Sequence, residues 1–96
     1  MENSKKMIRV ILTIIGEVQG VFFRAYAQAK AQELRVTGWV ANESDGTVTV
    51  VAEGPENQVN QLADWCQSGP SNAQVEKVER KDAQYIGEFE EFSIRY

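Results

Sequence analysis

The sequence contains no histidine and only one cysteine, Cys66. The absence of histidine removes the most frequent general base, the most frequent zinc ligand and every Ser–His or Cys–His nucleophile pair. A single cysteine forms no intrachain disulfide, and a reducing, cytoplasmic setting is the simplest fit. Any chemistry must therefore depend on positioning, on electrostatics or on carboxylates.

The sequence also lacks an apolar stretch long enough to cross a bilayer. The longest one, Met7 to Ile15, is interrupted by one arginine and one threonine. Basic residues precede it, as in a secretory signal, but it ends at Gly16-Glu17 without the small-residue pattern of a cleavage site. We therefore interpret it as a core strand and expect residues 1–6 to form a flexible N-terminus.

An excess of positive charge is missing too, since the formal net charge is −4. Nucleic-acid backbones demand a basic surface, so we expect no nucleic-acid partner, and nothing points to a membrane partner. A small phosphorylated ligand needs only one local positive pocket and stays compatible with this charge. With 96 residues, 43% of them hydrophobic and 25% charged, the chain is expected to form a single domain over residues 1–96.

Alternating and periodic apolar patterns predict five strands and two helices. The strands are expected over Met7–Ile15, Thr37–Asn42, Thr47–Glu53, Gln74–Lys81 and Glu91–Tyr96. The helices are expected over Arg24–Leu34 and Glu56–Gln67, and a loop over Gly16–Phe23 precedes the first of them. This order, βαββαβ with a short extra C-terminal strand, predicts an α+β, ferredoxin-like sandwich with a mostly antiparallel sheet and two helices on one face.

The faces expected to point into the core follow from the same patterns. The strands contribute Ile8, Val10, Leu12, Ile14, Val48, Val50, Ala52, Phe92, Ile94 and Tyr96, and the helices contribute Ala27, Ala31, Leu34, Val59, Leu62, Ala63 and Cys66. The first strand is apolar on its other face as well, which is typical of a strand inside a sheet. Such a fold hosts many functions and decides nothing about chemistry by itself.

The segment from Gly16 to Arg24 joins the first strand to the first helix and carries the strongest chemical signal. Gly20 lets the backbone turn sharply, and a helix start offers unpaired N–H groups with a positive dipole end. Such a site favours phosphate, and the planar guanidinium of Arg24 matches two phosphate oxygens at once. On these residues alone, an ordinary loop and a solvated surface arginine remain the more frequent alternatives.

Asn42 ends the second strand beside Asp45-Gly46, which is a hairpin signal. An asparagine in this setting is more often a turn residue than a functional one. Glu17, Glu43 and Asp45 fit a solvated hairpin rim better than a metal cluster.

The two tryptophans and the cysteine are assigned to packing. We expect Trp39 and Trp65 to be core or partly buried aromatics, and Cys66 to pack as a small hydrophobe. The RNA-recognition fold shares this strand order, yet its basic aromatic motif is absent from the sequence.

Two long motifs resemble the signatures of the acylphosphatase family. They read Gly16-x-Val18-Gln19-Gly20-Val21-x-Phe23-Arg24 and Gly38-Trp39-Val40-x-Asn42-x-x-Asp45-Gly46. The ending Phe89-x-x-Phe92-x-Ile94-x-Tyr96 is similar to the family's C-terminal strand, and the resemblance covers the chain from about Met7 to Tyr96. Arg35 and Ile15 depart from the pattern, at positions where glycine and a polar residue are frequent.

The resemblance implies an enzyme that hydrolyses the carboxyl–phosphate bond of small acyl phosphates without a metal or another cofactor. Arg24 matches the arginine that binds the phosphoryl group, and Asn42 matches the asparagine that orients the attacking water. The phosphate-binding loop matches Glu17, Val18, Gln19, Gly20, Val21, Phe22 and Phe23. The implied partner is a small-molecule acyl phosphate, and members of the family are typically monomeric.

Two other functions remain as alternatives. A module of a larger hydrogenase-maturation carbamoyltransferase would share the fold, but the chain length and the missing zinc-finger cysteines argue against it. A ligand-binding domain that has lost catalysis is disfavoured by the presence of both Arg24 and Asn42. The sequence leaves open the physiological substrate and the place of the last strand in the sheet.

Overall fold

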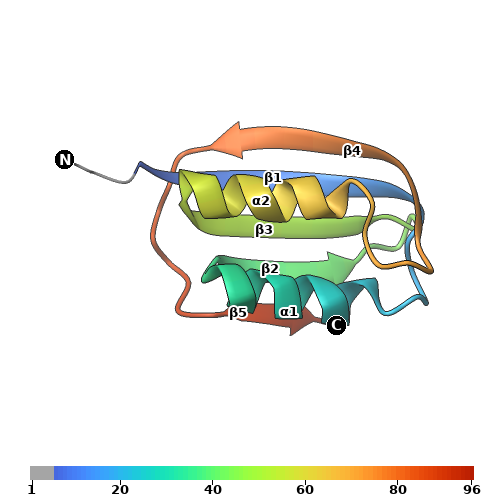
Figure 1. The fold of residues 1–96 in the computed structure, drawn as a ribbon. Coiled ribbons are helices and arrows are strands. Elements are labelled where there is room, and N and C mark those ends of the chain that lie inside the picture. The colour runs from blue at the N-terminus through green and yellow to red at the C-terminus, as the bar shows by residue number, and fades with distance from the viewer. Residues whose placement is uncertain (1–5) are drawn as a thin grey trace.

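The computed structural model describes residues 6–96, and Figure 1 shows how their elements are arranged. The strands are β1 (Met7–Glu17), β2 (Thr37–Asn42), β3 (Val48–Pro55), β4 (Gln74–Ala83) and β5 (Phe92–Arg95). The helices are α1 (Phe23–Leu34) and α2 (Glu56–Cys66). The flexible N-terminus predicted for residues 1–6 lies, except for Lys6, outside the described residues. Neither of the helices in this part of the chain is long and apolar enough to cross a membrane.

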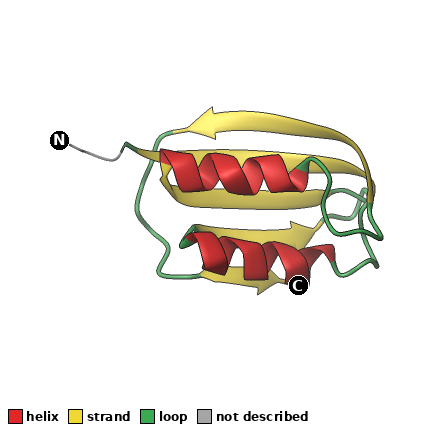
Figure 2. Cartoon of the chain, viewed as in Figure 1, coloured by secondary structure: helices red, strands yellow, loops and turns green. Residues whose placement is uncertain are grey.

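The five strands form one sheet in the order β4-β1-β3-β2-β5. Neighbouring strands are antiparallel except β2 and β5, which are parallel. Both helices cover the same face of this sheet, as Figures 1 and 2 show. The predicted ferredoxin-like sandwich is therefore confirmed. The last strand, whose place the sequence left open, lies at the sheet edge beside β2.

The core fills the space between the two helices and the sheet. Its strand residues include Val10, Leu12, Ile14, Val48, Val50, Ala52 and Phe92, and its helix residues include Ala27, Ala31, Val59, Leu62, Ala63 and Cys66. The faces predicted from alternation and helical spacing are confirmed at these positions. Ile8, Leu34 and Ile94 are only partly buried and pack at the margin of the core.

The strand β1 continues to Glu17, whereas the sequence predicted an end at Ile15. Gly16 permits the close pairing with β4, because a Cβ at this position would collide with the backbone carbonyl of Gln74. The pairing register shifts between Ile15 and Gly16, which marks an irregularity in the ladder. The loop before α1 is therefore shorter than predicted and spans residues 18–22.

Three further predicted boundaries are corrected by tertiary pairing. The strand β3 extends to Pro55, which pairs with Met7, and β4 extends to Ala83, which pairs with Arg9. The last strand ends at residue 95, and Tyr96, which was expected to point inward, is 98% exposed. The ends of these strands are set by where the neighbouring strand stops pairing. The alternation of apolar residues in the sequence does not report that point.

Arg35 ends α1 in the left-handed backbone region, with a φ of 59°. This backbone conformation costs a residue with a Cβ about 1–2 kcal/mol of stability, so glycine is frequent directly after helices. Replacement of Arg35 by glycine is expected to raise the free energy of unfolding by about 0.5–1 kcal/mol. This gain is smaller than the strain that is relieved, because glycine loses more conformational entropy on folding. Urea denaturation measures the change. As a control, Glu33→Gly inside the helix should lower the value by about 1 kcal/mol; equal losses in both variants would contradict the strain at Arg35.

Candidate active site

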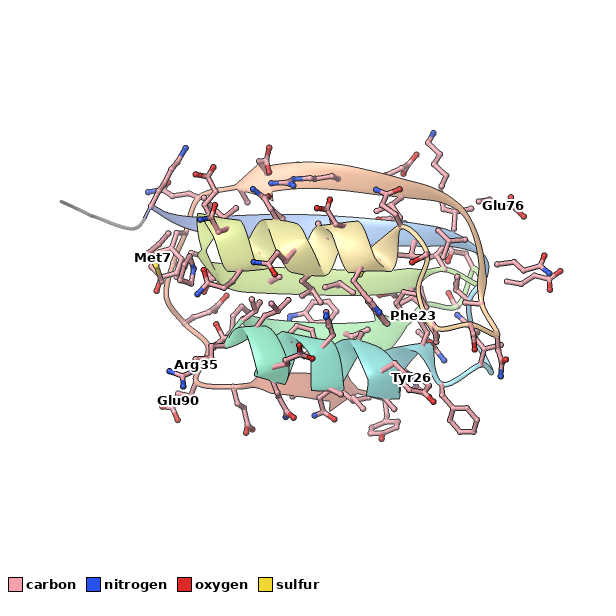
Figure 3. All side chains as sticks on the ribbon, viewed as in Figure 1. Met7, Phe23, Tyr26, Arg35, Glu76 and Glu90 are labelled. Atoms are coloured by element: carbon pink, nitrogen blue, oxygen red, sulfur yellow. The ribbon has the colours of Figure 1, made fainter. Side chains whose placement is uncertain are left out.

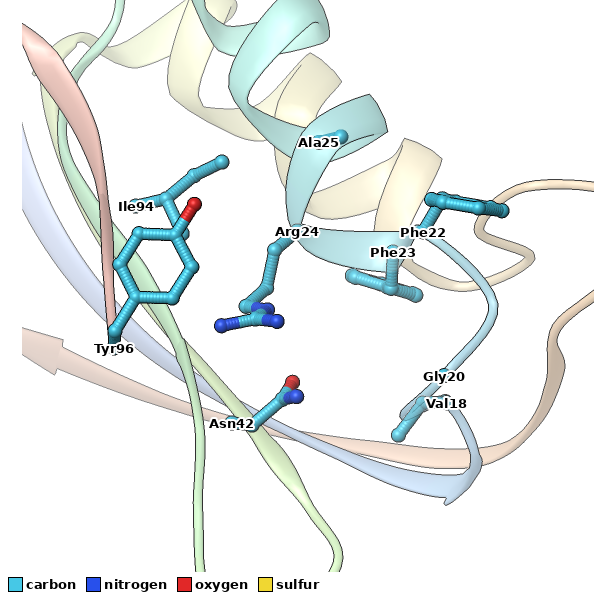
Figure 4. A pocket seen from close by; sticks show the side chains of 9 residues that line it. All are labelled: Val18, Gly20, Phe22, Phe23, Arg24, Ala25, Asn42, Ile94 and Tyr96. Atoms are coloured by element: carbon cyan, nitrogen blue, oxygen red, sulfur yellow. The ribbon is translucent and has the colours of Figure 1, made fainter.

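A cavity of about 290 Å³ opens between the start of α1, the end of β2 and the end of the chain (Figure 4). Its lining residues are Val18, Gly20, Phe22, Phe23, Arg24, Ala25, Asn42, Ile94 and Tyr96. Among the side chains of this lining, Arg24 alone carries a formal charge. A local positive pocket therefore exists in a chain whose net charge is −4.

Arg24 and Asn42 come from different elements and reach the same space. Arg24 extends from the first turn of α1, and Asn42 is the last residue of β2. In Figure 4 the guanidinium of Arg24 and the amide of Asn42 point toward one another across the cavity. Within residues 6–96 neither side chain makes a hydrogen bond or an ion pair to the protein, so both polar ends are available to a ligand.

The start of α1 is not capped by the chain itself. Its N-cap residue, Phe22, has a φ of 63° and makes no side-chain capping bond, and the first turn contains no acidic residue. The first N–H groups of the helix and the positive end of its dipole are therefore not neutralised, which favours an anion in the adjoining cavity. The left-handed backbone of Phe22 is costly for a bulky residue, and strain of this kind is typical of ligand sites.

The predicted phosphate-binding loop divides into residues that line the cavity and residues that do not. The lining residues are Val18, Gly20, Phe22 and Phe23. Glu17 is the exposed end of β1, and Val21 packs against the core. The side chain of Gln19 points to the β2–β3 hairpin, where it donates hydrogen bonds to backbone carbonyls. The structure therefore places four of the seven predicted loop residues around the cavity.

Phe23 fastens the start of α1 to the second helix. Its side chain is buried and lies between the helices in Figure 3, with its ring centroid 5.4 Å from that of Trp65. Trp65 is partly buried, and so is Trp39, whose ring lies 4.3 Å below the guanidinium carbon of Arg95. Both tryptophans are therefore partly buried aromatics, as predicted. Because Arg24 directly follows Phe23, the backbone of Arg24 is held by this packing.

Three lining residues, Ala25, Ile94 and Tyr96, were not predicted to belong to the site, and the last two come from the C-terminal segment. The Cζ atom of Arg24 lies 5.0 Å from the ring centroid of Tyr96, within the range of a cation–π contact. The contact uses one face of the ring and leaves Tyr96 98% exposed. Alternation placed Ile94 and Tyr96 in the core, and only the C-terminal motif of the family carried a signal for them.

The acidic residues near the β2–β3 hairpin do not form a metal-binding site. Glu17, Glu43 and Asp45 are exposed, and across residues 6–96 no group of three or more His, Cys, Asp or Glu side chains is arranged to hold a metal ion. Hydrogen bonds from the hydroxyl and the N–H of Thr47 to Asp45 lower the pKa of that carboxyl. Asp45 therefore stabilises the turn, as the hairpin interpretation expected.

Cys66 is a packing residue at the end of α2. Its side chain is fully buried, and this burial raises the pKa of the thiol to about 12. A thiol with this pKa stays protonated at neutral pH and is a poor nucleophile. The prediction that Cys66 packs as a small hydrophobe is therefore consistent with its surroundings.

Known proteins resemble this chain in sequence and in fold. The family model of acylphosphatases matches residues 10–94. The acylphosphatase of Geotalea uraniireducens is 46% identical, over 93% of this chain and 98% of its own length. The solved structure of an acylphosphatase from Coxiella burnetii is 35% identical with a TM-score of 0.89, covering 98% of this chain and 100% of that one. Full-length HypF, solved in a phosphate- and nucleotide-bound form, matches with a TM-score of 0.88 at 23% identity over 13% of its own length, which shows likeness of fold alone.

Proposed function

The chain belongs to the acylphosphatase family and hydrolyses acyl phosphates, and we propose that it does so in the cavity that Arg24 and Asn42 line. The observation that carries this proposal is that these two side chains point into the same cavity beside an uncapped helix start. The substrates are small acyl phosphates, which are split into a carboxylate and inorganic phosphate. A cavity of about 290 Å³ has room for such molecules.

Arg24 supplies the positive charge for the phosphoryl group. Its guanidinium donates hydrogen bonds to two phosphoryl oxygens. Backbone N–H groups of the loop Glu17–Phe23 and of the helix start donate hydrogen bonds to the remaining phosphoryl oxygens. Charge spreads over the equatorial oxygens in the transition state, so fixed donors bind that state more strongly than the substrate. The acyl group lies against the apolar part of the lining that Ile94 and Tyr96 provide.

Asn42 holds the attacking water through its side-chain amide. The water oxygen forms a bond to phosphorus while the bond from phosphorus to the acyl oxygen breaks, and the carboxylate leaves with the electron pair. A carboxylate is a good leaving group and needs no strong acid. Because an amide is a poor base and the sequence has no histidine, the water proton passes to a phosphoryl oxygen of the substrate.

We extend the proposal to the setting of the enzyme. Residues 1–96 form a single domain, which the span of the family model and the coverage of the relatives support. The enzyme is cytoplasmic, in agreement with a single cysteine that is free and buried. It is monomeric, as the resemblance to the family implies. It has no nucleic-acid or membrane partner. It needs no metal ion or other cofactor, because Arg24 and the helix start supply the positive charge.

Purified protein with acetyl phosphate and a metal chelator tests the proposed function. We expect release of inorganic phosphate far above the uncatalysed rate, and the same rate without the chelator. A rate equal to the uncatalysed one would remove the enzymatic proposal, and a rate that vanishes only with the chelator would remove the claim of metal independence.

Replacement of Asn42 by alanine is expected to lower kcat for acetyl phosphate by about 10²-fold or more, because misplaced reactants lose about this factor. The inhibition constant of inorganic phosphate should change far less, since Arg24 and the loop still bind the phosphoryl group. Steady-state kinetics measure both quantities, with Asn57→Ala on the exposed surface of α2 as the matched control. A kcat within threefold of the parent enzyme would remove the assigned role of Asn42.

A further inference from the structure

The side chain of Gln19 connects the two halves of the site. Its Nε2 atom donates a hydrogen bond to the backbone carbonyl of Glu43 at 2.7 Å and another to that of Thr47 at 2.9 Å. Gln19 itself lies between Val18 and Gly20, which both line the cavity. One amide group therefore ties the loop before α1 to the β2–β3 hairpin.

The two accepting carbonyls flank the position of Asn42. Glu43 directly follows Asn42, and Thr47 directly precedes Val48, which is the cross-strand partner of Asn42. The N–H of Glu43 also donates to the carbonyl of Thr47 at 2.8 Å, so the mouth of the hairpin is closed between the same residues. A shift of the Gln19 amide would therefore act on the backbone that carries Asn42.

We propose that Gln19 is a positioning residue that fixes the amide of Asn42 relative to the guanidinium of Arg24. Arg24 is carried by the loop and the start of α1, whereas Asn42 is carried by the end of β2 beside the hairpin. The Gln19 amide joins these two segments near the cavity. The proposal rests on the proposed function, since it concerns the placement of the water held by Asn42. The side chain of Gln19 does not touch the substrate in this account.

The chemistry of the side chain fits this task. A primary amide has two N–H donors, and here each donor has its own carbonyl acceptor. Methionine has nearly the same length without a donor, whereas the ammonium group of lysine again offers donors to both carbonyls. Because Gln19 is exposed, its replacement leaves no buried polar group unpaired, and the fold is expected to survive.

The test compares Gln19→Met and Gln19→Lys with the parent enzyme, using acetyl phosphate as substrate and inorganic phosphate as inhibitor. We expect Gln19→Met to lower kcat by about tenfold to a hundredfold, because small misplacements of reacting groups cost up to about 10²-fold. The inhibition constant of phosphate should stay within about threefold, and the melting temperature should match that of the control Gln61→Met on α2. Gln19→Lys should recover most of the lost rate.

Several results would overturn the proposal. One is a kcat for Gln19→Met within twofold of the parent, and another is a phosphate inhibition constant that rises as much as kcat falls. A failure of Gln19→Lys to recover activity would do the same. The side-chain amide resonances of Asn42, assigned by their loss in Asn42→Ala, give a readout without turnover, and we expect them to shift or broaden in Gln19→Met. An inactive parent enzyme would refute the proposed function. If the parent is active and the Asn42 amide resonances are unchanged in Gln19→Met, the role of Gln19 alone is refuted.

Discussion

Replacement of Arg24 by alanine is expected to lower kcat/KM for acetyl phosphate by about 10³-fold or more, the range found when arginine clamps are lost from phosphoryl-transfer sites. Arg24 brings the one charged side chain among the residues that line the cavity. Without it, the charge that develops on the phosphoryl oxygens meets only backbone N–H groups. Steady-state kinetics measure the loss, and inhibition by inorganic phosphate should weaken together with it.

Lysine at the same position separates charge from geometry. Arg24→Lys keeps a positive charge but lacks the planar fork that binds two oxygens at once, so we expect it to recover only a small part of the rate. Arg35→Ala, at the opposite end of the same helix and exposed (Figure 3), serves as the matched control and should keep full activity. An Arg24→Ala variant that retains a tenth or more of the parent rate, with the fold intact, would contradict the assigned role.

Among residues 6–96, Glu53 is the fully buried charged residue, and it lies at the end of the sheet away from the cavity. Its side chain is fully buried in β3. Its Oε2 atom accepts a hydrogen bond from Arg9 at 3.0 Å and one from the N–H of Ile86 at 2.9 Å, and its Oε1 accepts from the N–H of Gly87 at 3.1 Å. Glu53 therefore holds the segment that leads from β4 across to β5.

Replacement of Glu53 by glutamine is expected to lower the free energy of unfolding by about 3–5 kcal/mol, because it leaves Arg9 without its buried partner. Urea denaturation measures the loss. Glu88 offers a matched control, since it also bonds Arg9, at 2.9 Å, but is half exposed. Glu88→Gln should cost less than about 1 kcal/mol. Equal costs for the two variants would contradict the importance of the buried pair.

The same residue predicts a pH dependence of stability. Burial acts to raise the pKa of Glu53, but the hydrogen bonds from Ile86, Arg9 and Gly87 outweigh it, and the pKa lies below its ordinary value of 4.5. The stabilisation by Glu53 is therefore complete above pH 4.5 and is lost as the pH falls through the lowered pKa. The difference in unfolding free energy between the parent and Glu53→Gln should shrink below this pH, whereas a constant difference down to pH 3 would contradict this origin.

The order of the elements and much of the core were predictable from the sequence because both follow from short-range patterns. Alternation in Val10, Leu12 and Ile14 reports a strand with one buried face whatever the rest of the chain does. The spacing of Val59, Leu62 and Cys66 does the same for a helix. The ends of strands were less predictable, because a strand ends where its partner ends.

The neighbours of the cavity were only partly predictable. Arg24 and Asn42 lie inside motifs, so the resemblance to the family pointed to them before the structure brought them together. Tyr96 reaches Arg24 only because β5 pairs with β2 at the sheet edge, and no local pattern reports that pairing. The hydrogen bonds of Gln19 likewise join segments that are distant in the sequence.

Buried charge was the least predictable feature. Glu53 stands in an alternating strand and looks, in the sequence, like an ordinary polar position near a strand end. Its burial depends on Arg9 from β1 and on the backbone of Ile86 and Gly87, which the topology brings to it. Only the folded arrangement supplies these partners.

Hydrolysis of acetyl phosphate in water labelled with oxygen-18 tests the central claim most directly. In the proposed mechanism the water held by Asn42 attacks phosphorus beside Arg24, so the new bond joins the water oxygen to the phosphoryl group. The account predicts rapid turnover by the parent enzyme with the label in inorganic phosphate. Label in the acetate would mean attack on the carbonyl carbon instead, and that result would contradict the account.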